Sequence, residues 1–88
     1  MNDNHSHFRT SDTALAAFLQ SEGYTLLEID YSDEKRAELV FALNSPNEQV
    51  EIEDKRREYY GLRAIGNVAQ FHENYRKLAR MIRFKLPV

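Results

Sequence analysis

The sequence predicts an α+β domain, in which a small sheet built on a central β-hairpin is covered by about three helices. Residues 24–31 and 37–44 alternate between apolar and polar side chains, which predicts two adjacent strands. The segments around them repeat their apolar residues at helical spacing. With 88 residues, 42% hydrophobic and 30% charged, the chain suits one globular domain. We expect the order β-α-β-β-α-(β)-α over residues 8–88, with room for short extra strands.

The N-terminal segment predicts a disordered tail, a short strand and a well-buried helix. Residues 1–7 are polar and unpatterned, as expected for a disordered tail. A short strand is expected at residues 8–10, and the sequence TSD that follows supplies oxygens that cap a helix. Apolar residues at helical spacing extend this helix from Asp12 to Glu22, and Gly23 suits its end.

The two alternating segments predict a β-hairpin whose apolar faces turn toward one core. The polar sequence SDEKR between them predicts the turn. The residues expected to face the core are Leu27, Ile29, Tyr31, Leu39, Phe41 and Leu43.

A second helix is predicted to begin after the hairpin. Ser45 is a capping residue, Pro46 takes the first helical position, and Glu48 completes a capping box. We expect this helix to run to Tyr60. Its apolar face is thin, so that the sequence QVEIE in its middle also suits a strand.

The last helix has the clearest pattern in the chain. It follows residues 62–65, which suit a short edge strand. At 100° per residue, Arg76, Arg80 and Arg83 fall on one flank of the helix and form a basic row, whereas Lys77 lies on the outer face. The apolar stripe expected to pack inward, with a histidine at its edge, is Val68, Phe71, His72, Tyr75, Leu78, Ala79 and Ile82.

Charge is distributed unevenly along the chain. Residues 1–54 hold three basic and twelve acidic residues, whereas residues 55–88 hold nine basic and two acidic residues. Such asymmetry marks a partner-binding end in some proteins. In others, acidic and basic elements of one fold lie side by side and neutralise each other.

The composition excludes several kinds of site. The chain has no cysteine, which excludes disulfides, cysteine-ligated zinc, iron–sulfur clusters and thiol nucleophiles. Its longest apolar run, Ala14–Leu19, is far shorter than the roughly 20 residues of a membrane-spanning helix, and it lacks the flanks of a secretory signal. We expect a soluble cytoplasmic protein with no membrane partner.

The sequence contains no catalytic or cofactor motif that we recognise. Its glycines are isolated and form no phosphate-binding loop, and neither an HExxH motif nor a nucleophile elbow occurs. His5 and His7 stand in the predicted tail without further metal ligands nearby. We therefore predict no enzyme, no cofactor and no metal site.

Three stretches of the chain carry a resemblance to a known family. They are FRTSDTALAAFLQSEGYTLLEID, KRAELVFAL and YYGLRAIGNVAQFHENYRKLARMI. Together they resemble a family of small domains of unknown function encoded in bacterial and phage genomes. The resemblance covers residues 8–82, and this chain departs from it by a longer charged segment around residues 48–57. It implies a small α+β domain of bacterial or mobile-element origin, and it implies no reaction. The matching positions are Phe8, Thr10, Asp12, Leu15, Ala16, Phe18, Leu19, Gly23, Phe41, Tyr60, Gly61, Phe71, Leu78 and Ile82.

The basic residues near the C-terminus, together with the segment KRREYYGLR, suggest a non-catalytic domain that binds nucleic acid. Its cations would contact phosphates while a tyrosine stacks on an unpaired base. The candidate residues are Arg76, Arg80, Arg83, Lys77, Arg56, Arg57, Arg63, Tyr59 and Tyr60.

Two other interpretations remain open. In one, the domain is a protein-interaction or self-associating module that binds through a sheet edge or through its oppositely charged halves. In the other, the basic row is only a solvated helix face, in which Glu73 pairs with Lys77. The net charge of −2 and the isoelectric point of about 5.9 weigh against nucleic acid. The concentration of positive residues beside aromatic ones narrowly favours it.

Overall fold

The computed structural model describes residues 7–61 and 68–88, and it confirms the α+β class. The expected strand at residues 62–65 lies outside the described residues. The elements, in chain order, are β1 (His7–Thr10), α1 (Thr13–Ser21), β2 (Leu26–Asp30), β3 (Glu38–Ala42), α2 (Pro46–Tyr60) and α3 (Val68–Arg83).

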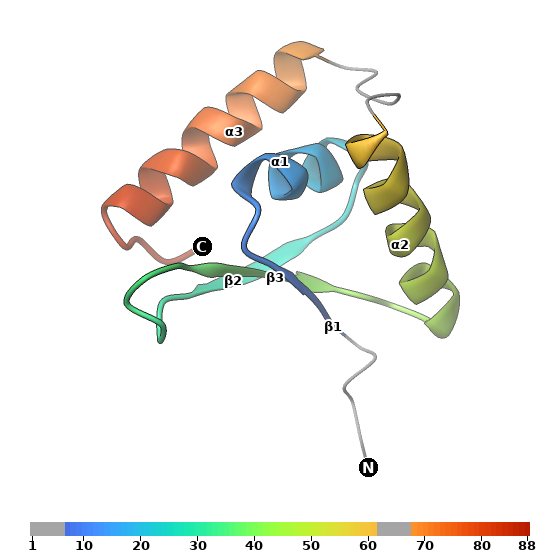
Figure 1. The fold of residues 1–88 in the computed structure, drawn as a ribbon, viewed down its shortest axis with the longest axis horizontal. Helices are drawn as coiled ribbons and strands as arrows, with labels where there is room; N and C mark the ends of the chain where they lie inside the picture. The colour runs from blue at the N-terminus through green and yellow to red at the C-terminus, as the bar shows by residue number, and fades with distance from the viewer. Residues whose placement is uncertain (1–6, 62–67) are drawn as a thin grey trace.

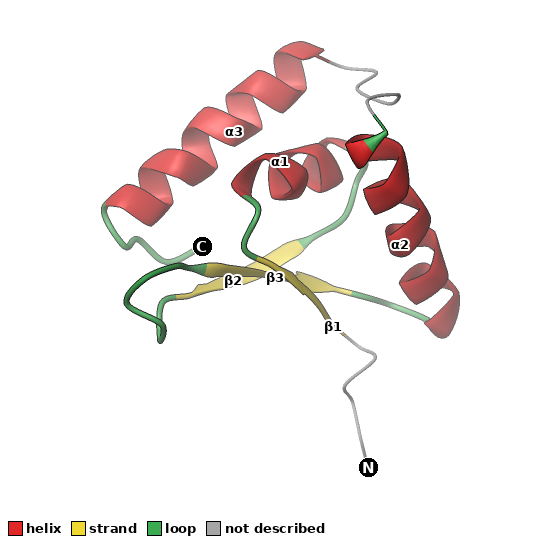
Figure 2. Ribbon diagram, in the orientation of Figure 1, coloured by secondary structure: helices red, strands yellow, loops and turns green. Residues whose placement is uncertain are grey.

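The three strands form one antiparallel sheet in the order β1-β3-β2. The predicted hairpin is therefore present, and the short N-terminal strand pairs with its second strand, so that Phe8 lies opposite Phe41. Helices α1 and α3 lie on the same side of the sheet, whereas α2 stands beside α1 at one end (Figures 1 and 2). None of the helices in the described part of the chain lies on the other side of the sheet.

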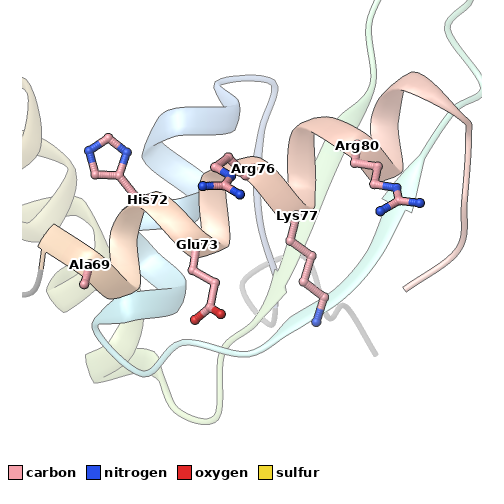
Figure 3. Close-up of a pocket in the computed structure, with 6 residues that line it drawn as sticks. All are labelled: Ala69, His72, Glu73, Arg76, Lys77 and Arg80. Atoms are coloured by element: carbon pink, nitrogen blue, oxygen red, sulfur yellow. The ribbon is translucent and has the colours of Figure 1, made fainter.

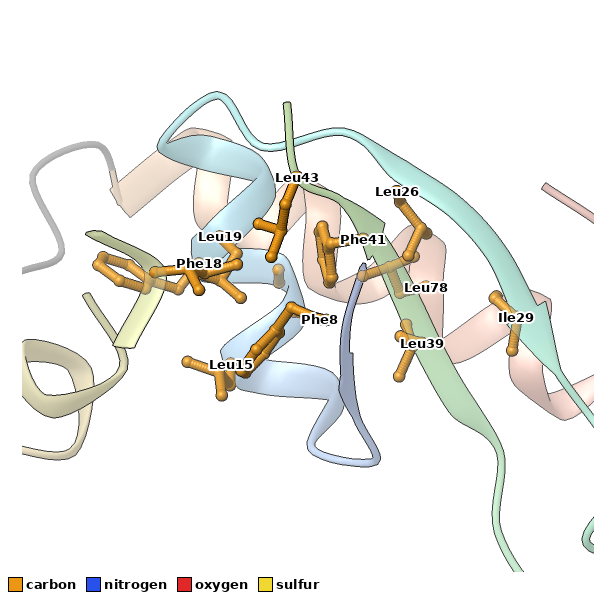
Figure 4. Close-up of a cluster of buried hydrophobic side chains, with 13 residues drawn as sticks. Phe8, Leu15, Phe18, Leu19, Leu26, Ile29, Leu39, Phe41, Leu43 and Leu78 are labelled. Carbon is orange, nitrogen blue, oxygen red and sulfur yellow. The ribbon is translucent and has the colours of Figure 1, made fainter. Parts of the chain in front are cut away.

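The core lies between the sheet and helices α1 and α3 (Figure 4). Its largest side chains with less than 2% of their surface exposed come from α1, β3 and both later helices, because each element contributes one apolar face. They are Phe18, Phe41, Leu15, Leu19, Leu39, Ile52 and Leu78.

A bulge in β2 changes which of its residues face the core. Leu26 pairs with Phe41 and Glu28 pairs with Val40, so Leu27 is an extra residue on β2. One extra residue reverses the alternation of side chains along a strand. The expectation that Leu27 faces the core was therefore wrong, and this side chain is 46% exposed while Leu26 is buried.

The helix-free side of the sheet is covered by an ion-pair cluster. The guanidinium Nη1 of Arg9 lies 3.2 Å from Asp30 Oδ2 and 2.9 Å from Glu38 Oε1. Arg9 is paired in register with Val40, which is only 2% exposed. The hydrogen bonds that Asp30 accepts from Ser32 and Arg9 lower the pKa of Asp30 to about 2.

Local signals place the ends of α1 as the sequence predicted. Asp12 is the N-cap, and its Oδ1 accepts a hydrogen bond from the backbone N–H of Leu15 at 3.0 Å. Thr10 Oγ1 accepts one from the N–H of Asp12 at 3.1 Å. Gly23 follows the helix with φ of +100°, a conformation that glycine adopts without strain.

The predicted second helix is continuous through QVEIE, but its capping differs in detail. Ser45 is the N-cap residue and makes no side-chain capping hydrogen bond. Glu48 Oε1 instead accepts a hydrogen bond from the N–H of Asn44 at 2.9 Å. Ile52 is the one buried residue that the structure shows on α2, so this helix packs through a narrow face.

Helix α3 turns a slightly different face inward than its apolar periodicity predicts. Leu78 is buried, and Phe71 and Ile82 pack against the core as expected. Three other members of the predicted stripe are exposed, and for them the prediction was wrong: Val68, His72 and Tyr75.

The cause is a polar contact that periodicity does not reveal. Asn74 Nδ2 donates a hydrogen bond to the backbone oxygen of Ala17 in α1 at 3.3 Å. Met81 is also partly buried against the core. Asn74 and Met81 lie on one side of Leu78, and Tyr75 lies on the other. Because the side with Asn74 turns inward, the side with Tyr75 turns toward solvent.

The chain beyond α3 folds back toward the sheet. Leu86 N donates to Met81 O at 2.8 Å and Lys85 N donates to Ile82 O at 3.2 Å, the pattern of a Schellman cap. Lys85 has φ of +54°, in the left-handed region where glycine is usual. The hydroxyl of Tyr31 lies 2.7 Å from Leu86 O, which fixes this segment beside the hairpin.

Candidate nucleic-acid interface

The outer face of α3 presents four cations to solvent. Arg76, Lys77, Arg80 and Arg83 are all exposed, because Leu78 and Asn74 on the opposite face hold the helix against the core and α1. Figure 3 shows three of the four projecting from the helix. The predicted basic row is therefore a solvent-facing surface.

These four cations have no ion-pair partner within residues 7–61 and 68–88. In this described part of the chain, the ion pairs join carboxylates to Arg9, Lys55, Arg56 and Arg57, and none includes a residue of α3. The pair expected between Glu73 and Lys77 is thus not formed. Figure 3 shows the side chain of Glu73 directed away from Arg76.

Two shallow depressions flank the basic row along α3. The first, which we call the polar depression, is shown in Figure 3 and contains a carboxylate. It is lined by Ala69, His72, Glu73, Arg76, Lys77 and Arg80. The second, which we call the aromatic depression, has three arginines and no carboxylate among its lining residues. It is lined by Tyr75, Arg76, Ala79, Arg80, Arg83 and Phe84.

The cations of α2, which include the predicted Arg56 and Arg57 and also Lys55, have a different environment. Lys55 Nζ lies 2.8 Å from Glu22 Oε1 in the turn after α1, and this hydrogen bond raises the pKa of Lys55. Arg57 Nη1 lies 2.6 Å from Asp54 Oδ1, one helical turn earlier. These side chains are engaged within the fold.

Arg56, the remaining described cation of α2, is also engaged. Its Nη1 lies 3.5 Å from Glu53 Oε1, and its guanidinium carbon lies 5.6 Å from the centre of the Tyr60 ring. Arg63, which was predicted with this group, lies outside the described residues.

The two tyrosines predicted to stack on a base have roles in packing α2. The ring centre of Tyr59 lies 5.4 Å from that of Phe18 in α1 and 6.5 Å from that of Phe71 in α3. The hydroxyl of Tyr60 donates to Asp12 Oδ2 at 2.7 Å. Burial, together with this hydrogen bond, raises the pKa of Tyr60 to about 12.

The aromatic side chains that accompany the basic row are Tyr75 and Phe84, which are 40% and 59% exposed. Neither was among the candidate residues: the sequence placed Tyr75 in the core, and Phe84 follows the last periodic position. The structure thus separates the predicted set into paired residues of α2 and unpaired residues of α3. It adds two aromatic residues to the latter.

Two further observations concern the described residues as a whole. Within residues 7–61 and 68–88, no three histidine or acidic side chains are grouped in a way that could hold a metal ion. None of the helices in this part of the chain has the length and apolar character needed to cross a lipid bilayer.

One family model matches nearly the whole chain. It is described as a domain of unknown function (DUF5659), and the match covers residues 5–84, including all of α3. No curated protein and no solved structure is detectably similar to the chain.

Proposed function

The chain belongs to the DUF5659 family of domains of unknown function, and we propose that it is a non-catalytic domain that binds the phosphate backbone of a nucleic acid through the outer face of α3. The observation that carries this proposal is the set of four exposed cations on one helix, none of which forms an ion pair within residues 7–61 and 68–88. They are Arg76, Lys77, Arg80 and Arg83.

Unpaired cations in a chain of net negative charge call for an explanation. The domain carries −2 overall, yet residues 68–88 contain five basic residues and one acidic residue. A solvated helix face would be expected to use its neighbouring carboxylate, as α2 does at Arg56 and Arg57. The arginines of α3 instead remain available to a partner of opposite charge.

Helix stability accounts for only part of this arrangement. Arg80 and Arg83 lie in the last turn of α3, where cations interact favourably with the negative end of the helix dipole. Arg76 and Lys77 lie near the middle of the helix, beyond the reach of that effect. A phosphate backbone explains all four.

The spacing of the row also suits a polyanion. Arg76, Arg80 and Arg83 rise along the helix axis by about 6 Å and then about 4.5 Å. Guanidinium groups donate paired hydrogen bonds to phosphate oxygens. A repeating anion is therefore a better match than a single small anion.

The test is a titration of labelled oligonucleotides at about 50 and 200 mM salt. If roughly four phosphates are neutralised, the affinity for duplex falls about 100-fold between these conditions, and somewhat less for a single strand. Absence of binding at the lower salt overturns the proposal.

A matched pair of variants locates the surface. The double change Arg76→Glu with Arg80→Glu alters the net charge by the same amount as Arg56→Glu with Arg57→Glu. We expect the change on α3 to abolish binding and the change on α2 to weaken it far less, with both proteins folded by circular dichroism. Equal losses would show that only net charge matters and would remove α3 as the site.

The alternative function is a protein-interaction or self-associating module. It is favoured by the exposed apolar residues at the C-terminus, where Phe84, Leu86 and Val88 are 59%, 42% and 57% exposed. Sedimentation of the protein over a hundredfold concentration range tests self-association. A constant monomer mass would reject that form of the alternative.

The absence of cysteine suits a reducing compartment. The proposal accordingly places the domain in the cytoplasm. Fractionation of cells that express a tagged full chain tests this placement.

A further inference from the structure

The aromatic depression combines apolar ring surface with arginines in a way that the polar depression does not. Its lining residues are the aromatic side chains Tyr75 and Phe84, the small residue Ala79 and the three arginines of the basic row. No carboxylate lines it, so negative charge can approach without repulsion from the lining residues.

The ring of Tyr75 is held in place before any partner binds. It lies nearly parallel to Phe71, with an interplanar angle of 17° and ring centres 6.4 Å apart. Phe71 itself packs against the ring of Tyr59 on α2. The tyrosine is therefore the outermost ring of a row that begins in the core, and little side-chain freedom is left to lose on binding.

Phe84 is the second aromatic residue that lines the aromatic depression. The guanidinium carbon of Arg83 lies 5.5 Å from the centre of its ring. The segment that carries Phe84 is fixed by the cap after α3, in which the N–H of Phe84 donates to Arg80 O at 3.1 Å. An exposed phenylalanine is thus presented beside two arginines by a defined backbone.

We infer that the aromatic depression takes an unpaired nucleobase, so that the nucleic acid bound by α3 is single-stranded. This inference rests on the proposed function. Base faces in a duplex are already stacked on one another, and a duplex offers only phosphates, sugars and base edges to an approaching helix. Exposed rings next to arginines are useful only where base faces are free, as in a single strand.

The chemistry of one nucleotide matches the two parts of the depression. The apolar face of a base would lie against Tyr75 and Ala79, while its phosphate meets Arg76 or Arg80. Stacking accepts every base, because each has a flat ring face. Binding is therefore expected to depend weakly on sequence.

The test compares one single strand and one duplex of equal length, using the full chain and the double variant Tyr75→Leu with Phe84→Leu. These changes keep apolar volume and remove the rings. We expect the variant to lose at least about fivefold in affinity for the single strand, since stacking contributes about 1 to 3 kcal/mol per base. Its affinity for duplex changes by less than about twofold, because phosphate contacts remain.

A conservative variant separates ring chemistry from folding. Tyr75→Phe with Phe84→Tyr keeps both rings and should bind the single strand as the unchanged protein does. Thermal unfolding of each variant checks that α3 is intact. Loss of binding in this conservative variant would overturn the inference.

The outcomes of this test distinguish failure of the single-strand inference from failure of the proposed function. If the unchanged protein binds duplex as tightly as single strand, or if the ring changes weaken both equally, the single-strand inference fails and backbone binding stands. If neither oligonucleotide binds, the proposed function itself fails. If poly-glutamate of matched charge binds as well as the single strand, the surface serves an acidic protein and both are overturned.

Discussion

Helices α2 and α3 are both rich in arginine and lysine, yet the fold uses these residues in opposite ways. On α2, the described cations lie 2.6 to 3.5 Å from carboxylates of the same helix or of the turn after α1. On α3, no described cation is so paired, and four face solvent together with two exposed rings. Basic composition alone therefore does not identify a binding surface, because cations that form ion pairs within the fold are not available to a partner.

The two helices also differ in how they are attached. α3 packs through a stripe around Leu78, supported by the bond from Asn74 to α1. α2 buries Ile52 and adds polar contacts, such as the hydroxyl of Tyr60 on Asp12 and the ammonium of Lys55 on Glu22. Helix α3, whose described cations form no ion pair with the described residues, is held by apolar contacts. Substitutions on its outer face should therefore leave its packing against the core intact.

The largest expected effect tests that attachment. Leu78→Ala removes a side chain that is 1% exposed and should lower the free energy of unfolding by about 2 to 5 kcal/mol. Urea unfolding followed by circular dichroism measures the loss. Val50→Ala on α2, at a residue that is 64% exposed, is the control and should change stability by less than about 0.5 kcal/mol. A loss below about 1 kcal/mol at Leu78 would show that α3 is held by something else.

The attachment of α2 is expected to be sensitive to alkaline pH. The pKa of Tyr60 is raised from 10.0 to about 12, so folding favours the protonated hydroxyl. Its contribution is fully present below pH 10 and is lost as the pH rises through about 12. Tyr60→Phe should cost about 1 kcal/mol at neutral pH, and this cost should disappear and then reverse in sign as the phenol ionises, because a phenolate no longer donates to Asp12 and is repelled by its carboxylate. Urea midpoints of both proteins across this range measure the difference, and a constant difference would contradict the assignment.

A smaller effect of opposite sign is expected at the end of α3. Lys85 has φ of +54°, and Lys85→Gly should raise the free energy of unfolding by about 0.5 to 1 kcal/mol because glycine adopts this conformation without strain. Lys85→Ala removes the same charge and keeps the strained backbone, so it serves as the control. Thermal unfolding of the two variants separates the effects. Equal stability of both would show that the left-handed backbone at this position costs no measurable free energy.

The smallest expected effect concerns the paired cations of α2. Asp54→Asn removes the carboxylate that Arg57 contacts, and both side chains are more than half exposed. The loss should be only about 0.3 kcal/mol, and it should vanish at high salt. Denaturant unfolding at low and high salt measures it. A new affinity for oligonucleotides in this variant would be informative in another way, since it would show that freeing an arginine is enough to create a site.

Local signals explain why much of the fold was predictable. The cap at Asp12 and the positive φ at Gly23 depend on residues adjacent in sequence, and the ends of α1 were predicted within one residue. The bulge at Leu27 depends on pairing with β3, and the orientation of α3 depends on a bond between Asn74 and the backbone of α1. Neither contact can be inferred from the pattern of apolar and polar residues. The sequence therefore did not predict the orientation of Leu27 or of α3.

The sequence predicted the exposed cations of the candidate site but not the contacts that engage residues of α2. Periodicity placed Arg76, Arg80 and Arg83 on one exposed flank, as the structure shows. It could not show that Tyr60 is bonded to Asp12, since 48 residues separate them in the chain. Nor could it distinguish Arg57, which pairs with the carboxylate three positions earlier, from Arg76, which has Glu73 at the same spacing and does not.

The bulge in β2 has a consequence for the behaviour of the protein at high concentration. β2 and β1 are the two outer strands of the sheet that residues 7–61 and 68–88 form, and unpaired outer strands can recruit further copies and grow into fibres. A bulge increases local twist and interrupts the regular row of backbone donors and acceptors. β1 has only four residues. Both outer strands are thus poor templates for aggregation. Deleting the extra residue at Leu27 would make β2 a flatter and more regular outer strand, and so a better template.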